Sequence, residues 1–336
     1  MSANSPRNNE DIAGKLKDKA ARLGFCALGI APARDGKKLV QRLATRPRPP
    51  FVRWEPGYCC APERWLPGAQ SVLVGAVSYG HRYGKGVLSP RQGYFSPFAH
   101  RPDYHVLVRE KLEALGQYLC ALKPGTRCLV QVDSGPGCER IFALLAGIGW
   151  QGKNNFIIVP GHGSFVWLGM LVTDLPLPAD EPLPDACGDC RRCLQACPTG
   201  AYSAPYQYAH QRCLAYWASR KGGLSAEEAK LLGKYRIIYG CDFCQLACPH
   251  NDAGNHEGAA GVDLADVLTM SPARFRELFG GTAAEWRGRS VLRRNAVLAS
   301  AANTELRPAL AQVAREQGPA AEWARRVLEH ADADDV

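Results

Sequence analysis

The sequence predicts an α+β protein built from three successive parts, and three observations support this prediction. Residues 1–180 alternate strand-like and helical patterns, residues 181–260 hold a dense group of cysteines, and residues 261–336 have the pattern of short helices. A proline-rich segment, "TDLPLPADEPLPDA", separates the first part from the second. We therefore expect domains at 1–180, 181–260 and 261–336.

The first part contains short apolar runs bounded by glycine and proline. "FCALGIAP", "SVLVGAVSYG", "CLVQVDSGP" and "FIIVPGHGSFVWLGMLVTD" predict strands. "YHVLVREKLEALGQYLCAL" and "ERIFALLAGIGW" carry apolar residues at helical spacing and predict helices. The mixture predicts an α/β or α+β domain.

The last part is expected to be a tail of short helices. The segments "SVLRRNAVLASAA", "TELRPALAQVAREQ" and "PAAEWARRVLEHA" each show helical periodicity. Thr304 is placed to cap the second helix, and Gly318-Pro319 separates it from the third. Short stacked antiparallel helices of this kind are typical of HEAT repeats.

Composition bounds the class of protein. The chain has 336 residues, of which 46% are hydrophobic and 22% charged, as in ordinary globular proteins. The segment "MSANSPRNNEDIAGKL" has no apolar core of a secretory signal, so we expect a cytoplasmic protein without a membrane span. In a reducing compartment, 14 cysteines indicate metal ligation rather than a disulfide framework.

The net charge of +9 is concentrated in islands at residues 34–64, 207–240 and 274–294. Basic islands favour a polyanionic partner, with nucleic acid the leading candidate. A soluble surface with surplus arginine would explain the charge equally well.

Two cysteine runs carry the most specific signal. In "CGDCRRCLQACP", Cys187, Cys190, Cys193 and Cys197 follow the Cys-x2-Cys-x2-Cys-x3-Cys-Pro spacing of bacterial ferredoxin [4Fe–4S] sites. Three thiolates on one tight loop reach one cluster, and the fourth ligates a different cluster. The second run, "CDFCQLACP", repeats the last three positions, with Ile238 where the first cysteine would stand.

If the last cysteine of each run ligates the cluster held by the other run, the cysteines divide into two sets of ligands. Cys248 completes a first set, which consists of Cys187, Cys190, Cys193 and Cys248. The second set then has Cys197, Cys241 and Cys244, and Cys213 is the only other cysteine between residues 187 and 248. Two structural zinc sites are the alternative, but the three-residue gap followed by proline, found twice, favours iron and sulfur.

The N-terminal part carries neither a Rossmann fingerprint nor a P-loop, so its chemistry rests on other features. Asp133 follows the predicted strand of "CLVQV" and is placed for acid–base work at a strand end. A cap on the following helix is the alternative role. The glycines of "GIGWQGKN" indicate backbone close to a bulky ligand, or a glycine-rich turn.

The segments "VDSGPGCER", "AGIGWQGKN" and "GSFVWLGMLVTDLPLP", followed by the two cysteine runs, resemble the epoxyqueuosine reductase family over about half the chain. The resemblance implies reduction of epoxyqueuosine to queuosine at the wobble position of tRNA, with base-off cobalamin and two [4Fe–4S] clusters. It implies a reductive-dehalogenase-like cobalamin domain, a ferredoxin-like domain and a HEAT-like tail.

The resemblance also implies roles for particular residues. Asp133 would be the proton donor, and Cys213 would be the last ligand of the second cluster. Contacts to cobalamin would come from Asp133, Ile157, Leu168, Cys241 and Asp242.

Conversion of an epoxide to an alkene consumes two electrons and two protons and releases water. Asp133 would protonate the departing oxygen, so we expect burial against the corrin to raise its pKa. None of the histidines is expected on cobalt, and most of them are expected at the surface or in caps. We expect six phosphate contacts to the anticodon stem-loop of tRNA: Arg220, Lys221, Arg287, Arg289, Arg293 and Arg294. For any one of them, a solvated arginine or lysine on a helix face is the alternative.

Electrons would come from an external one-electron donor such as a flavodoxin or ferredoxin, and the chain is expected to be a monomer. Two other functions stay open at this point. One is a cobalamin-dependent reductive dehalogenase of small organohalides, a class usually exported with a twin-arginine leader. The other is a ferredoxin-type electron carrier that needs no cobalamin.

Overall fold

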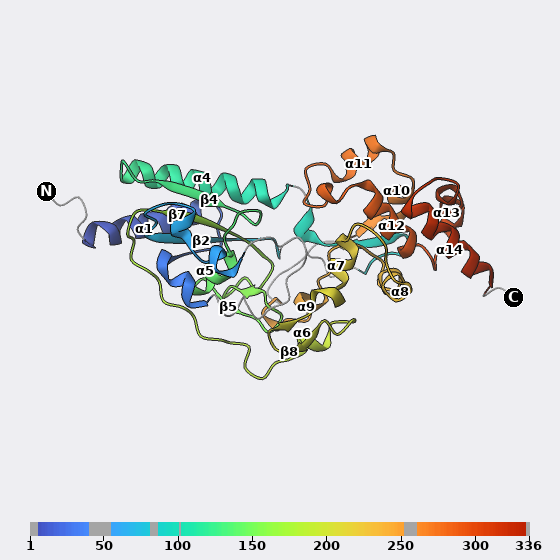
Figure 1. Cartoon of the computed structure of the whole chain (residues 1–336), viewed down its shortest axis with the longest axis horizontal. Helices are drawn as coiled ribbons and strands as arrows, with labels where there is room; N and C mark the ends of the chain where they lie inside the picture. The colour runs from blue at the N-terminus through green and yellow to red at the C-terminus, as the bar shows by residue number, and fades with distance from the viewer. Residues whose placement is uncertain (1–5, 40–54, 81–86, 101, 252–260, 334–336) are drawn as a thin grey trace.

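The computed structural model describes residues 6–39, 55–80, 87–100, 102–251 and 261–333. The molecule is elongated, with the N-terminal sheet at one end and the C-terminal helices at the other (Figure 1). Most helices of the cysteine-rich segment lie between these ends, whereas α8 (Ala226–Lys234) lies beside the C-terminal helices (Figure 1). In the described ranges, every helix is too short or too polar to cross a bilayer.

A four-stranded antiparallel sheet forms the centre of the N-terminal part. Its strand order is β1 (Ala27–Pro32), β2 (Ser71–Ser78), β7 (Val166–Thr173) and β4 (Cys128–Gln131). All three pairings are antiparallel. Seven of the eight residues of β2 are buried, because helices cover both faces of the sheet.

The alternation of side chains along β2 and β7 divides the core into two layers. Leu73 and Leu171 point to one face, where α1 (Pro6–Arg22) and α4 (Tyr104–Leu122) pack. Val74 and Met170 point to the other face, where α5 (Glu139–Leu145) packs. The strand and helix predictions for these segments are confirmed.

Short elements complete this part: α3 (Pro56–Cys59), β5 (Trp150–Gln151) and β6 (Ile157–Ile158). The last two pair with each other and hold a loop whose role is described below.

The cysteine-rich segment consists of two similar loop–helix units and the elements that connect them. The helical turns α6 (Arg192–Gln195) and α9 (Phe243–Leu246) pack against each other. The connecting elements are β8 (Tyr202–Ala204), β9 (Gln207–Tyr208), α7 (Leu214–Ser219), α8 (Ala226–Lys234) and β10 (Ile237–Tyr239).

A second sheet joins distant parts of the chain. Its central strand is β3 (Gln92–Phe95), which pairs in parallel with β10 and antiparallel with β11 (Gly261–Asp263). The chain therefore crosses from the N-terminal part into the C-terminal part and returns before α4. The domain boundaries at 180 and 260 stay predictions.

The tail contains α10 (Leu264–Thr269), α11 (Pro272–Phe279), α12 (Arg289–Ala299), α13 (Arg307–Ala314) and α14 (Pro319–Ala333). The three predicted helices are confirmed as α12, α13 and α14. The predicted cap at Thr304 is wrong, because Asn303 accepts the backbone N–H of Glu305 at 3.0 Å and caps a short turn before α13. The predicted α+β architecture with a helical tail is confirmed.

Candidate functional site

The first predicted set of cysteines is brought together. Cys187, Cys190, Cys193 and Cys248 line one cavity of about 330 Å³, part of which opens to solvent. Electrostatic interactions link the thiol of Cys193 to the other three, and that of Cys248 to Cys187 and Cys190. The four thiols surround a space, as ligands of one cluster would.

A buried donor without an acceptor lies beside this set. Trp150 is only 7% exposed and packs against Cys248 and Cys187. Its indole Nε1 has no hydrogen-bond partner among the described residues. Because buried donors are almost always satisfied, the residues here fit a group with acceptor sulfurs.

Lys153 provides a positive charge at the same cavity. Its Nζ donates to the carbonyl oxygens of Gly188 and, at 2.8 Å, Cys190. Lys153 also lines the cavity, where its charge would offset that of the thiolates.

The second set is also brought together. The thiol of Cys244 interacts electrostatically with those of Cys213 and Cys197, and Cys241 interacts with Cys213 and Cys244. Burial raises the pKa of Cys213, Cys241 and Cys244.

Hydrogen-bond donors already point at the sulfurs of this second set. The hydroxyl of Tyr202 donates to Cys244 Sγ at 3.7 Å, and the N–H of Ala201 donates to Cys197 Sγ at 3.3 Å. Within the described ranges, no three His, Cys, Asp or Glu side chains converge on a position that a single metal ion could occupy. The donor chemistry of both sets fits thiolates bound to a larger group.

The loop between β5 and β6 ties the N-terminal part to both cysteine units. Asn154 Nδ2 donates to the carbonyl of Cys244 at 3.3 Å, and Asn154 O accepts the hydroxyl of Tyr202 at 3.1 Å. Gly152, Lys153 and Asn154 line the cavity of the first set. The glycine-rich segment "GIGWQGKN" thus lies where a cluster would be held.

Asp133 lies in an exposed and strained turn after β4. Its backbone φ is 48°, in the left-handed region that residues other than glycine rarely adopt. Its N–H donates to Glu139 Oε1 at 2.6 Å, and its side chain is 63% exposed. Asp133 does not cap α5, whose N-cap is Cys138 without a side-chain hydrogen bond.

Residues at the start of α4 hold the Asp133 carboxylate. Tyr104 donates its hydroxyl to Asp133 Oδ2 at 2.7 Å, and His105 Nε2 lies 3.2 Å from the same oxygen. The other ring nitrogen, Nδ1 of His105, lies 2.7 Å from Asp103 Oδ1. Asp103 also caps α4 by accepting the N–H of His105. The imidazole therefore bridges two carboxylates.

The contacts of His105 with the two carboxylates change the pKa of both His105 and Asp133. The hydrogen bond from His105 outweighs the effect of burial and lowers the pKa of Asp133. Burial opposes the charge on His105, but its bonds to Asp133 and Asp103 outweigh burial and raise the pKa of His105. The pKa of Asp133 is lowered in this structure, and its expected rise through burial against the corrin stays a prediction. His105 contacts both Asp103 and Asp133, a role that the sequence did not indicate.

Glu139 differs from Asp133. Burial raises the pKa of Glu139 to about 7, with the neighbouring charge of Asp133 as a second cause. Its carboxyl group accepts the backbone N–H of Asp133, which fixes the turn.

A row of aromatic rings connects the second cysteine set with Asp133. Tyr79 interacts with Cys244 electrostatically and stacks on Trp167 with ring centroids 4.8 Å apart. Trp167 stacks on Tyr104, at 6.0 Å, and Tyr104 holds Asp133. The thiols and the acid therefore lie on neighbouring parts of one site.

The predicted cobalamin contacts lie in different surroundings. Ile157 is buried, whereas Leu168 is half-buried on β7. Cys241 belongs to the second set. Asp242 is buried and accepts hydrogen bonds from Tyr94, Ser96 and Gln245. Of the predicted cobalamin contacts, Asp133 has the most open side chain.

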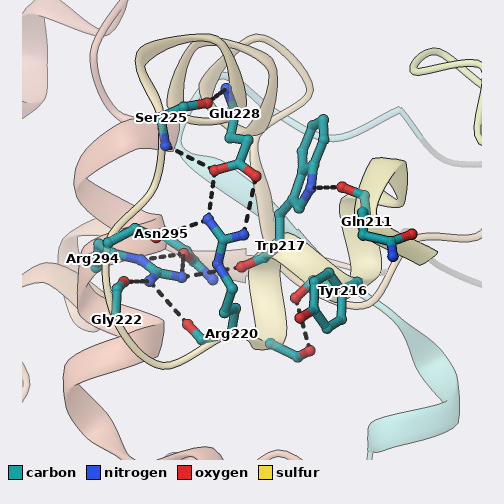
Figure 2. A network of polar contacts seen from close by, with 11 residues as sticks. Gln211, Tyr216, Trp217, Arg220, Gly222, Ser225, Glu228, Arg294 and Asn295 are labelled. Carbon is teal, nitrogen blue, oxygen red and sulfur yellow. Dashed lines mark hydrogen bonds and ion pairs between the residues drawn. The ribbon is translucent and has the colours of Figure 1, made fainter. Parts of the chain in front are cut away.

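Two of the predicted phosphate contacts are wrong. Arg294 is 2% exposed, and its guanidinium donates to the carbonyls of Trp217, Arg220 and Gly222 and to Asn295 (Figure 2). Arg293 is 6% exposed and forms two hydrogen bonds with Glu316. Both face the core because α12 is buried on most of its surface.

The other four predicted contacts keep accessible surface. Lys221 is exposed, whereas Arg220, Arg287 and Arg289 are half-buried. Arg220 pairs with Glu228, as Figure 2 shows, and Arg289 donates to the carbonyl of Met270 at 2.9 Å. Phosphate contact stays a prediction for these four.

Fold and site together define a redox enzyme whose electron-carrying segment adjoins an acid–base group. Residues 186–251 match the family described as the 4Fe-4S double cluster binding domain, and residues 60–134 match the family described as epoxyqueuosine reductase QueG, DUF1730. The chain is 35% identical to epoxyqueuosine reductase of Bacillus cereus over 83% of this chain and 77% of that protein. It belongs to the epoxyqueuosine reductase family, and it is an oxidoreductase.

Solved structures agree with this assignment. One is epoxyqueuosine reductase with an epoxyqueuosine-modified tRNA-Tyr stem loop, with a TM-score of 0.85, 30% identity, and coverage of 94% of this chain and 88% of that one. Another is epoxyqueuosine reductase from Bacillus subtilis with the catalytic loop of an aspartate swung out of the active site, with a TM-score of 0.84, 29% identity, and coverage of 94% and 89%.

Proposed function

We propose that this chain reduces epoxyqueuosine to queuosine at the wobble position of tRNA, using cobalamin and two [4Fe–4S] clusters. The observation that carries the proposal is that both sets of thiols and Asp133 lie close together in one molecule. Two sets of four thiols lie in one molecule, and an aromatic row joins the second set to Asp133.

The reaction defines what each group must supply. An epoxide becomes an alkene when two electrons and two protons are added and the oxygen leaves as water. Cobalamin, when bound, supplies a low-valent metal centre that accepts single electrons and acts on carbon. Asp133, Ile157, Leu168, Cys241 and Asp242 are proposed to contact it, and the exposed carboxylate of Asp133 is consistent with an open site there.

Asp133 is proposed to donate the proton to the departing oxygen. The pKa of His105 is raised and that of Asp133 is lowered, so the pair favours a proton on the imidazole over one on the carboxylate. His105 then serves as the reservoir that returns a proton to Asp133. Tyr104 and Asp103 hold the two groups in line.

The RNA partner is proposed from the relative solved with a tRNA stem loop and from the basic surface. Arg220, Lys221, Arg287 and Arg289 are the predicted phosphate contacts that keep accessible surface. A flavodoxin or ferredoxin is proposed as the electron donor, and the chain as a cytoplasmic monomer.

The test is nucleoside mass spectrometry of tRNA that carries epoxyqueuosine. The tRNA is incubated anaerobically with protein reconstituted with iron, sulfide and cobalamin, and a low-potential reductant is added. Formation of queuosine that requires cobalamin supports the proposal. Unchanged epoxyqueuosine, or zinc instead of iron in anaerobically prepared protein, contradicts it.

A further inference from the structure

A tryptophan is exposed in the turn before α12. Trp286 is 56% exposed and lies in the short turn Glu285–Arg287, before α12. The guanidinium carbon of Arg287 lies 3.4 Å from the centroid of its ring, so a cation covers part of the indole.

A buried tyrosine, Tyr239, lies beside the indole of Trp286. The hydroxyl of Tyr239 interacts with the side chains of both Trp286 and Arg287. Tyr239 is 5% exposed and packs on Phe95 and Phe98, so the support is part of the core. An exposed indole fixed in this way has little conformational freedom to lose on binding.

The same turn adjoins the acid–base group. The N–H of Asp103 donates to the carbonyl of Gly281 at 3.0 Å, and the N–H of Gly281 donates to Glu285 at 2.8 Å. Tyr239 also interacts electrostatically with Asp133. The turn that carries Trp286 is therefore linked through Gly281 to Asp103, which holds His105, and we expect the reacting nucleoside to lie nearby.

We propose that Trp286, backed by Arg287, is a stacking platform for an unpaired RNA base adjacent to the reacting nucleoside. This inference rests on the proposed function. Proteins bind single-stranded RNA by stacking bases on aromatic rings and arginine planes. Chemistry on a base also requires that it leave the stack, which uncovers a neighbouring base.

Charge favours this occupant over an apolar partner. Arg287 lies against the ring itself, and Arg289, two residues further on, also keeps accessible surface. A base with its phosphate matches an aromatic face with a cation beside it.

The test is fluorescence anisotropy with a 5′-labelled anticodon stem-loop RNA and the full-length holoenzyme. Trp286→Ala should weaken binding by about 10- to 100-fold, the effect of losing one stacked base. Trp286→Phe keeps a ring and should retain most of the affinity. A blunt RNA duplex made from the stem alone should bind wild type and Trp286→Ala equally.

Trp323 provides a matched control, because Arg326 lies over its ring at 5.0 Å on α14. Trp323→Ala should leave the affinity for the stem-loop unchanged. Thermal unfolding of each variant shows whether it is folded, and Trp286→Leu replaces Trp286→Ala if the smaller side chain does not support folding.

Wild-type affinity of folded Trp286→Ala or Trp286→Leu overturns the inference, and so does an equal loss on the duplex. The conversion of epoxyqueuosine by wild-type protein is measured in parallel. If wild-type protein converts epoxyqueuosine and the Trp286 variant binds the stem-loop normally, the stacking proposal is rejected and the proposed function is retained. If the variant loses affinity for the stem-loop but not for the duplex, and wild-type protein does not convert epoxyqueuosine, the stacking proposal is retained and the proposed function is rejected.

Discussion

The two sets of cysteines have the same ligand chemistry but different surroundings. The first set lines a cavity that is partly open to solvent, with Lys153 beside it. Tyr202 and Tyr208 cover the second set, and Tyr79 joins it to the aromatic row that ends at Asp133. With clusters bound, the first set would be the more accessible to an electron donor, and the second set would lie nearer to Asp133.

Removal of one ligand from each set tests this difference most severely. Cys190→Ala and Cys213→Ala should each roughly halve the iron content and abolish turnover, because each disables one cluster. Iron analysis and EPR spectroscopy of the reduced proteins measure the outcome. A protein donor should still reduce the remaining cluster of Cys213→Ala but not that of Cys190→Ala. Loss of all iron in either variant would show that the sets do not form independently.

Asp133→Asn should lower turnover by about 10²–10⁴-fold, the usual contribution of a general acid. Iron content should be unchanged, because Asp133 belongs to neither set of cysteines. Cobalamin should be retained, because asparagine has nearly the same shape as aspartate. Mass spectrometry of the product nucleoside measures the rate. Glu139→Gln is the matched control, since an amide oxygen can still accept the N–H of Asp133, and its effect should be small. Undiminished product formation by Asp133→Asn rules out the acid role.

His105 should set the alkaline limit of the reaction. Its pKa is raised above the ordinary value, so the imidazolium is present at lower pH and is lost as pH rises through the raised pKa. His105→Asn should lower the single-turnover rate by about 10- to 100-fold and flatten the alkaline limb of the pH profile. An unchanged limb would place the titrating group elsewhere. Cluster content again should not change.

Removal of one hydrogen bond to sulfur should change the midpoint potential of one cluster and not that of the other. This is the smallest of the expected effects. Trp150→Phe removes the unpaired indole N–H beside the first set, and Tyr202→Phe removes the hydroxyl that donates to Cys244. Loss of one bond worth about 1 kcal/mol should lower the midpoint potential of one cluster by about 40 mV and leave the other unchanged. EPR-monitored redox titration measures both. Equal shifts of both clusters would contradict the assignment of these donors.

The cysteine sets could be predicted from sequence because thiolate spacing on a short loop leaves few ways to reach a cluster. The helices and central strands could be predicted for a similar reason, since their apolar periodicity is local. The role of His105 could not, because its partner Asp133 lies 28 positions along the chain. The direction of the pKa shift of Asp133 depends on that same distant contact.

Arg293 and Arg294 show a second limit of sequence reasoning. Charge alone placed them at the surface, yet α12 is surrounded by α8, α10 and α14, and both side chains are buried. Arg294 satisfies three backbone carbonyls at the end of α7 and in the loop after it. A basic residue that satisfies such groups cannot be distinguished from a phosphate contact before the packing of its helix is known.

The strand Gln92–Phe95 has a consequence for dissection of the molecule. Among the described residues, it lies between β10 and β11 and pairs with both of them. A fragment that begins at residue 181 would keep all eight cysteines but expose two orphaned edges. The cysteine-rich segment and the tail therefore depend on a strand from the N-terminal part to complete their sheet.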